Sequence, residues 1–335
     1  RHPRHGRRRL REGDGRHGLP VTAPAPRPTL EHLPIPLLAM PMGTGGVGLA
    51  WRQAHHALGV PAAVGEALLG FTALLWIALV ALQALRAFRH PDAVLAELRH
   101  PVRVAFAAAP TIGLMIVAAF LHPHAPWLGA PLWGIAVALI LLVAMLLLRR
   151  ILAGRGEAAM LAPPLMIPFV GNVLAPVFGV GMGFVQASWM MFGVGIILWL
   201  AVQPLLLHRL FAGPPLPPGL RPSLAILLAP PAVGALALVA LTGQAGGPAL
   251  ALVGVALLIA AVLVSLAGEF ARVPFGLPWW GVTFPSAAFA VMVMVMGFPA
   301  PLGWAALLAT TALTGWVAWR TLRAAQAGAF FRPEH

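Results

Sequence analysis

The chain has 335 residues, of which 60% are hydrophobic and only 9% charged, and its mean hydropathy is +0.87. Soluble domains carry about 25% charged residues, so the composition excludes a soluble protein and predicts an all-α polytopic membrane protein. The formal net charge is +13, and every basic residue apart from histidine is arginine. Because the sequence contains no cysteine, disulfides, thiol chemistry and cysteine-ligated metals are excluded.

Residues 1–32 contain eight arginines among glycine, proline and histidine, with no apolar period. This composition predicts a disordered basic cytoplasmic tail. The charges are not followed by the apolar core of a cleaved signal peptide. Contact of the tail with anionic lipid is an alternative to a passive role.

Ten apolar segments follow, each close to the roughly 20 residues that cross a bilayer. They form one predicted transmembrane domain, 33–325, followed by a cytoplasmic C-terminal tail, 326–335. The segments are 34–54, 62–87, 102–122, 128–150, 163–184, 188–210, 222–242, 248–270, 278–298 and 301–323.

The arginines alternate between the connections of these segments. The connections on the side of the N-terminal tail, together with both tails, hold 21 of the 22 arginines, and the opposite side holds only Arg52. Positively charged loops stay in the cytoplasm, so both termini are predicted to be cytoplasmic and the number of spans to be even. This orientation in a plasma (inner) membrane explains the high positive charge without a nucleic-acid partner.

Prolines recur inside the odd-numbered segments and lie mainly near the ends of the even ones. This alternation predicts one kinked helix and one smooth helix, repeated five times, with the kinked helices around a cavity and the smooth helices facing lipid. The alternative is that proline is simply common in transmembrane helices. The predicted kinks lie at Pro41, Pro110, Pro176, Pro230, Pro231 and Pro285.

The ninth segment places a large aromatic residue, Phe284, directly before Pro285. Because a break in a membrane helix is tolerated only beside protein or a water-filled cavity, Phe284 is predicted to lie at a bend beside a cavity. Ordinary packing is the alternative role for such a side chain. Neutral polar residues at membrane depth, Thr44, Asn172 and Thr283, are candidates for lining the pore.

Catalytic and metal-binding patterns are missing from the sequence. It contains no Ser/His/Asp set, no P-loop and no paired carboxylates within a membrane segment, so no enzymatic activity and no cofactor are expected. His55-His56 and His122-Pro-His124 lie in outer connections without cysteine or aspartate, which favours exposed loop histidines over a metal site. Arg52, Glu66 and Glu269 lie at segment ends and are interpreted as interfacial.

Several short motifs, in order along residues 33–332, resemble those of the tellurite-resistance/dicarboxylate transporter family. This family includes bacterial TehA-like proteins, fungal malate permeases and sulfite pumps, and plant slow-type anion channels. The motifs are Pro41-Met-Gly43 with Leu49-Ala-Trp51; His100-Pro-Val-Arg103; Phe192-Gly193-Val-Gly195 with Trp199, Pro204 and Leu210; Leu228-Ala-Pro-Pro231; and Trp279-Trp280-Gly-Val-Thr-Phe284-Pro285.

The resemblance implies ten helices arranged as five hairpins around a central pore, with the odd helices inside and one pore in each protomer of a homotrimer. It also implies that Phe284 blocks the pore. The implied function is the passage of small inorganic or dicarboxylate anions through an occluded, channel-like pore. A coupled transporter or exporter of dicarboxylate, sulfite or tellurite-related anions is the alternative. An intramembrane enzyme or a receptor-like protein is a third and weaker hypothesis.

Overall fold

The computed structural model describes residues 29–331, and all regular structure within this range is helical. The predicted basic tail falls mostly on residues 1–28, and these, like 332–335, lie outside the described part; Leu30–His32 form a single 3-10 turn. The α-helices are α1 (Ala39–Leu58), α2 (Ala62–Arg89), α3 (Pro91–Arg99), α4 (Ala109–Leu121), α5 (Pro126–Arg150), α6 (Met166–Gly179), α7 (Val185–Ala212), α8 (Ala229–Thr242), α9 (Gly247–Ser265), α10 (Ala267–Phe270), α11 (Trp280–Val295) and α12 (Ala300–Gln326).

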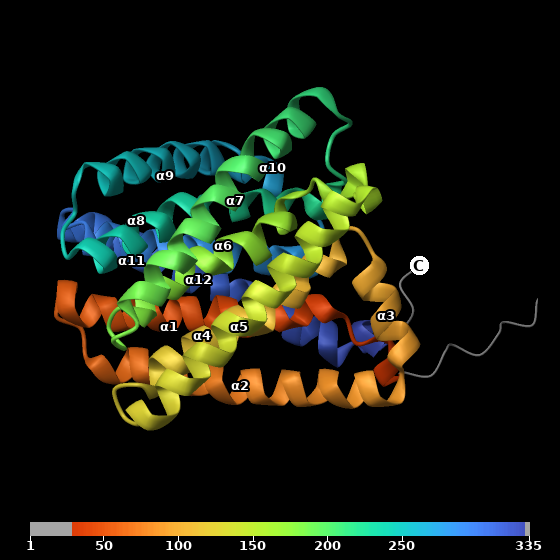
Figure 1. Ribbon diagram of the computed structural model, residues 1–335, viewed down its shortest axis with the longest axis horizontal. Helices are drawn as coiled ribbons and strands as arrows, with labels where there is room; N and C mark the ends of the chain where they lie inside the picture. The colour runs from red at the N-terminus through yellow and green to blue at the C-terminus, as the bar shows by residue number, and fades with distance from the viewer. Residues whose placement is uncertain (1–28, 332–335) are drawn as a thin grey trace, which may run out of the picture.

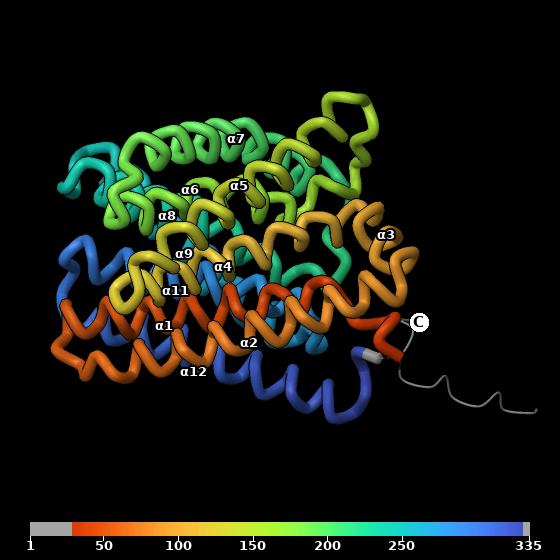
Figure 2. Tube along the Cα trace, turned by 60° about the horizontal axis from the view of Figure 1, so that its bottom comes forward, coloured from red at the N-terminus to blue at the C-terminus, as the bar shows by residue number. Residues whose placement is uncertain are grey.

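The long helices run roughly side by side along the bundle (Figure 1). Consecutive helices pack as five hairpins, namely α1–α2, α4–α5, α6–α7, α8–α9 and α11–α12. The first helix of each hairpin also packs on the first helix of its neighbours, and the contacts close into a ring in the order α1, α4, α6, α8, α11 and back to α1. Figure 2 shows α12 beside α1 at one edge of this bundle and α7 at the opposite edge.

Burial separates the two kinds of helix. In the spans that contain α4, α8 and α11, 67–72% of the apolar window is buried, compared with 17–28% in the spans that contain α2, α5, α7, α9 and α12. The odd spans are therefore the inner ring and the even spans the outer ring, which confirms the predicted arrangement. The outer helices present aliphatic and aromatic side chains where a soluble bundle would present charges.

All ten predicted segments are helical, with ends within a few residues of those expected. Eight helices in the described part are long and apolar enough to cross a bilayer. The fifth segment, Pro163–Gly179, is apolar but shorter. The first segment has 20 residues in α1, and its last two turns contain Arg52, Gln53, His55 and His56, which lower its hydropathy. Both pack within the inner ring, where they are covered by protein.

Each inner span begins with a 3-10 stretch that continues into an α-helix. These stretches are η2 (Ile35–Leu38), η3 (Arg103–Ala108), η6 (Pro163–Leu165), η7 (Pro218–Leu228) and η8 (Leu277–Trp279). A 3-10 stretch longer than a few residues is uncommon, so the eleven residues of η7 are unusual. The irregular start, more than a bend at mid-helix, distinguishes the inner spans from the outer ones.

The proline prediction needs correction in two respects. Pro41, Pro110, Pro230 and Pro231 lie in the first turn of their α-helices, at the junction with the preceding 3-10 stretch and not at mid-helix. Among the predicted kinks, only Pro176 and Pro285 lie inside a helix. The separation of odd from even spans is also incomplete, because Pro131 and Pro204 lie inside α5 and α7.

Two further features differ from the sequence-based expectation. The connection between the second and third spans contains a helix, α3, which lies at the end of the bundle where the described chain starts (Figure 1). The eighth segment is not continuous, because α9 ends at Ser265 and a separate turn, α10, follows.

The outer ring covers the inner ring unevenly. Besides its own hairpin partner, α2 contacts α4, α5 contacts α6, α7 contacts α8, and α12 contacts α1. Each of these helices covers the seam between two consecutive inner helices. The exception is α9, which packs on α8 and η7, so none of the described helices covers the seam between α8 and α11.

Glycine permits a close helix approach at α6–α7. A Cβ added at Gly195 would lie 2.7 Å from the backbone nitrogen of Val173, whereas a Cβ added at Gly193, two residues earlier, would meet no described atom within 4 Å. We expect Gly195→Ala to destabilise the protein by about 1–3 kcal/mol, because the backbone of α6 has to move.

The matched control is Gly193→Ala, which we expect to leave stability unchanged or to raise it by up to about 1 kcal/mol through helix propensity. Thermal unfolding of the purified variants in detergent measures both effects. Equal transition temperatures for the two variants would contradict the assigned contact.

Candidate functional site

A small cavity lies on the axis of the inner ring, and all five inner spans contribute to its wall. Its volume is about 20 Å³, which is room for roughly one water molecule. The wall is apolar, and none of the described residues that form it is charged. The lining residues are Met42, Ile112, Ile167, Val170, Gly171, Leu174, Ile226, Ala229, Gly281, Phe284 and Pro285.

Phe284 is the one aromatic side chain among these described lining residues, and it is buried. Its ring packs against α1 at Gly46, where an added Cβ would lie 3.2 Å from the ring atom Cδ2 and 3.1 Å from Cβ of Ala287. Because Gly46 has no side chain, the ring of Phe284 has room to pack against α1. The position beside a cavity agrees with the sequence-based expectation for Phe284.

Pro285 changes the backbone at the same level. Because proline has no N–H, it cannot donate the usual hydrogen bond to the carbonyl oxygen of Gly281, one turn earlier. Gly281 and Pro285 both line the cavity, so this weakened turn of α11 faces the axis of the ring.

The three polar candidates point elsewhere. Thr44 donates a hydrogen bond to the carbonyl oxygen of Met40 at 3.0 Å and accepts one from Thr72 of α2 at 3.1 Å. Thr283 is fully buried, donates to the carbonyl oxygen of Trp280 at 2.8 Å, and packs against Gly43 of α1. Neither residue is among the described residues that line the cavity. That Thr44 and Thr283 line a pore stays a prediction, and this arrangement does not favour it.

Asn172 is also fully buried and absent from the described lining. Its Nδ2 donates to the carbonyl oxygen of Pro168 at 2.8 Å, while Oδ1 has no partner among the described residues. The backbone carbonyl oxygen of Asn172 also lacks its usual helical partner, because the residue four positions later, Pro176, has no N–H. The unsatisfied groups are both acceptors and suit a buried water rather than an anion.

Hydrogen bonds fix α11 to its outer partner, α12. Nε1 of Trp280 donates to the hydroxyl of Thr321 at 2.9 Å, and the hydroxyls of Ser286 and Thr310 lie 2.8 Å apart. Thr283, Trp280, Thr310 and Thr321 are all buried. These bonds set the rotation of α11 about its axis and so direct Phe284 toward the cavity.

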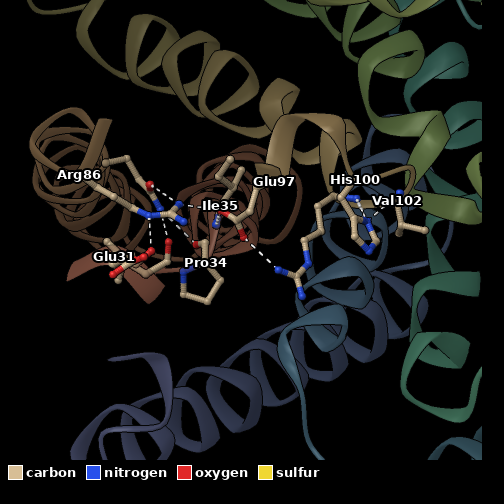
Figure 3. A network of polar contacts seen from close by, with 10 residues as sticks. Glu31, Pro34, Ile35, Arg86, Glu97, His100 and Val102 are labelled. Carbon is tan, nitrogen blue, oxygen red and sulfur yellow. Dashed lines mark hydrogen bonds and ion pairs between the residues drawn. The ribbon is translucent and has the colours of Figure 1, made fainter. Parts of the chain in front are cut away.

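Charges gather at the end of the bundle that the arginine distribution assigns to the cytoplasm (Figure 3). Arg86 of α2 is buried and makes a 2.6 Å ion pair with Glu97 of α3. It also donates to the carbonyl oxygen of Glu31 at 2.9 Å. Oε2 of Glu97 accepts from the backbone N–H of Ile35 at 3.3 Å, and Oε1 lies 3.4 Å from Arg103 of η3.

This clamp, formed by Arg86 and Glu97, ties the chain entering α1 to three other elements. Gln83 adds hydrogen bonds from Nε2 to the carbonyl oxygens of Leu33 and Pro34, at 3.2 and 3.1 Å. Sequence reasoning missed the clamp. The available signal was a pair of acidic residues, Asp92 and Glu97, in a connection that also carries several arginines.

The opposite end of the bundle has a second, more exposed charged cluster. Arg52 of α1 pairs with both carboxylate oxygens of Glu66 at 2.7 and 2.8 Å and donates to the carbonyl oxygen of Ala119 at 3.0 Å. His124 lies 3.2 Å from the same carboxylate. Arg52 and Glu66, interpreted from the sequence as separate interfacial residues, thus form one ion pair that joins α1 to α2. Across residues 29–331, no three histidine or acidic side chains gather as metal ligands would.

The fold and its axial cavity define a polytopic membrane protein with a helical ring around a small apolar cavity. The family model described as voltage-dependent anion channel matches residues 32–323, and the chain belongs to this family.

Curated relatives support this assignment. The chain is 27% identical over 271 residues to the S-type anion channel SLAH2 of Arabidopsis thaliana, covering 78% of this chain and 52% of the relative. It is 26% identical over 219 residues to the guard cell S-type anion channel SLAC1 of the same plant, covering 62% and 39%. It is 26% identical over 216 residues to the tellurite resistance protein TehA homolog of Haemophilus influenzae, covering 64% of each. The match spans about half or less of the plant channels.

The clamp gives a prediction about stability. We expect Glu97→Gln to destabilise the protein by about 3–5 kcal/mol, because it leaves the buried guanidinium of Arg86 without its counter-charge. The matched control is Glu157→Gln, which removes the carboxylate of an exposed pair with Arg150 and should cost no more than about 1 kcal/mol. Chemical unfolding in detergent compares them, and equal losses would show that the clamp is not a buried ion pair.

Proposed function

We propose that the protein is a passive pore for small anions and that Phe284 occludes it. The observation that carries the proposal is the axial cavity, because all five inner spans meet there and leave room for about one water molecule beside this ring. An anion of the size of chloride does not pass such a constriction unless the ring moves. Membership of the anion-channel family supports the same function.

The electrostatics favour anions without a tight binding site. The α-helical parts of the inner spans all start toward the cytoplasmic end, so their positive dipole ends face that half of the lumen. Arg103 at the start of η3 adds positive charge near the same mouth, where it pairs with Glu97 at 3.4 Å. An apolar constriction holds an anion weakly, and weak binding permits rapid exit.

The finer features of the proposal come from the arginine distribution and the family resemblance. The protein would lie in the plasma (inner) membrane with both termini in the cytoplasm. It would assemble as a homotrimer with one pore in each protomer. Small inorganic anions would be its main substrates.

Truncation of the ring tests the gate. We expect Phe284→Ala to raise anion flux into liposomes by at least about tenfold, which corresponds to about 1.4 kcal/mol of barrier. The control is Phe289→Ala on the same helix, whose side chain is absent from the described lining of the cavity and faces away from it. Unchanged flux in Phe284→Ala, or an equal increase in both variants, would remove the gate assignment.

The apolar wall gives a prediction about selectivity. Because it offers no charged or hydrogen-bonding side chain to replace water, an ion pays much of its dehydration cost on entry. We expect the flux through Phe284→Ala to follow ease of dehydration, with iodide and nitrate above chloride and with sulfate lowest. Liposome flux with one anion at a time gives the order. A preference for sulfate or a dicarboxylate would indicate a dedicated binding site and contradict the proposal.

A coupled transporter of dicarboxylate, sulfite or tellurite-related anions is the second candidate, favoured by the similarity to the tellurite resistance protein TehA homolog. It requires a substrate site and a coupling ion. A saturable flux that depends on a proton gradient would support it over the passive pore.

A further inference from the structure

A large groove opens on the side of the bundle where the outer ring is incomplete. It lies between α9 and α12, and α11 forms its back wall. Its volume is about 600 Å³, within the range of sites for drug-sized ligands. The seam between α8 and α11, which none of the described helices covers, opens into this groove.

The wall of the groove is almost entirely apolar. Leu263, Leu313 and Phe289 are typical of its lining. The two hydroxyls in it, on Ser286 and Thr310, are bonded to each other at 2.8 Å, so they leave no strong demand for a polar ligand. The body of the groove therefore suits a hydrocarbon chain.

One end of the groove has the character of a membrane interface. Trp279 and Trp316 line it and meet edge to face with ring centroids 4.8 Å apart. Tryptophan is enriched at the level of lipid headgroups. This end lies at the C-terminal ends of α9 and α12, which the arginine distribution assigns to the cytoplasmic side.

Two arginines stand at the same end. The guanidinium of Arg320, one turn beyond Trp316 on α12, lies 5.4 Å from the ring centre of Phe275 and 5.9 Å from that of Trp316. Arg272 is exposed between two lining residues, Ala271 and Val273. Neither arginine forms an ion pair with a carboxylate of residues 29–331.

We propose that this groove binds an anionic phospholipid of the cytoplasmic leaflet, with one acyl chain between α9 and α12 and the phosphate beside Arg320 and Arg272. The chain would cover the exposed seam of α11, and the headgroup would supply the missing counter-charge. Anionic lipids of this leaflet are attracted by about 1 kcal/mol for each basic residue near the surface. The proposal is independent of ion conduction.

Native mass spectrometry of the full chain, exchanged into detergent with equal amounts of phosphatidylglycerol and phosphatidylcholine of the same chain length, tests it. We expect one retained phosphatidylglycerol per protomer, and Arg320→Gln to lower its preference over phosphatidylcholine about fivefold. Ala309→Trp, which fills the groove from α12, should abolish retention of both lipids.

Two controls separate this site from general effects. Arg323→Gln removes an arginine that stacks on Trp319, outside the lining of the groove, and should keep the preference. Ala312→Trp places the same bulk on the lipid-exposed side of α12 outside the groove and should keep retention.

Equal retention of the two lipids by the unmodified protein, or retention by a folded Ala309→Trp variant, would overturn the proposal. So would efficient cross-linking of an Ala309→Cys variant to a second copy in lipid-free detergent, because another protomer would then occupy the groove. The absence of native cysteine makes such a cross-link unambiguous.

Discussion

The arrangement depends on one constraint, which is that irregular backbone inside a membrane has to be shielded from lipid. Each inner span starts with a 3-10 stretch, and four of the six predicted kink prolines sit just beyond it, in the first turn of the α-helix. Such starts carry backbone groups that regular α-helical bonding does not satisfy. Continuous outer helices of 19–28 residues surround them and contact lipid with backbones that are hydrogen-bonded along the helix, apart from the bonds lost at Pro131 and Pro204. The division into an inner and an outer ring therefore follows from backbone chemistry more than from side-chain polarity.

Three faces of α11 contact three different surroundings: the cavity, the groove and α12. One face carries Phe284 to the cavity, and a second face carries Phe289 to the groove. A third is held to α12 by Trp280 through its bond to Thr321. Thus α11 alone separates the axial cavity from the lipid-facing groove. A few hydrogen bonds to α12 fix its rotation.

Much of the fold could be predicted from the sequence because its signals are local. Segment ends followed from hydropathy, the inner and outer rings from the odd and even prolines, and the place of Phe284 beside a cavity from the proline after it. The directions of Thr44 and Asn172 could not be predicted, since a helix that is apolar on all sides gives no signal of its rotation. The clamp of Arg86 and Glu97 holds Glu31 and Ile35, which lie 55 and 62 residues away from their partners in the chain. The displaced position of α9 depends on packing, so neither feature leaves a local pattern.

The 3-10 starts also affect the reach of the inner spans. A 3-10 helix rises about 2.0 Å per residue and an α-helix about 1.5 Å. The 19 residues of η3 and α4 therefore extend about 31 Å, close to the hydrocarbon thickness of a bilayer, where a pure α-helix of that length would extend about 28 Å. The 3-10 start in this way lengthens a short inner span by about 3 Å, so that it crosses the hydrocarbon core with fewer residues along the axis of the ring.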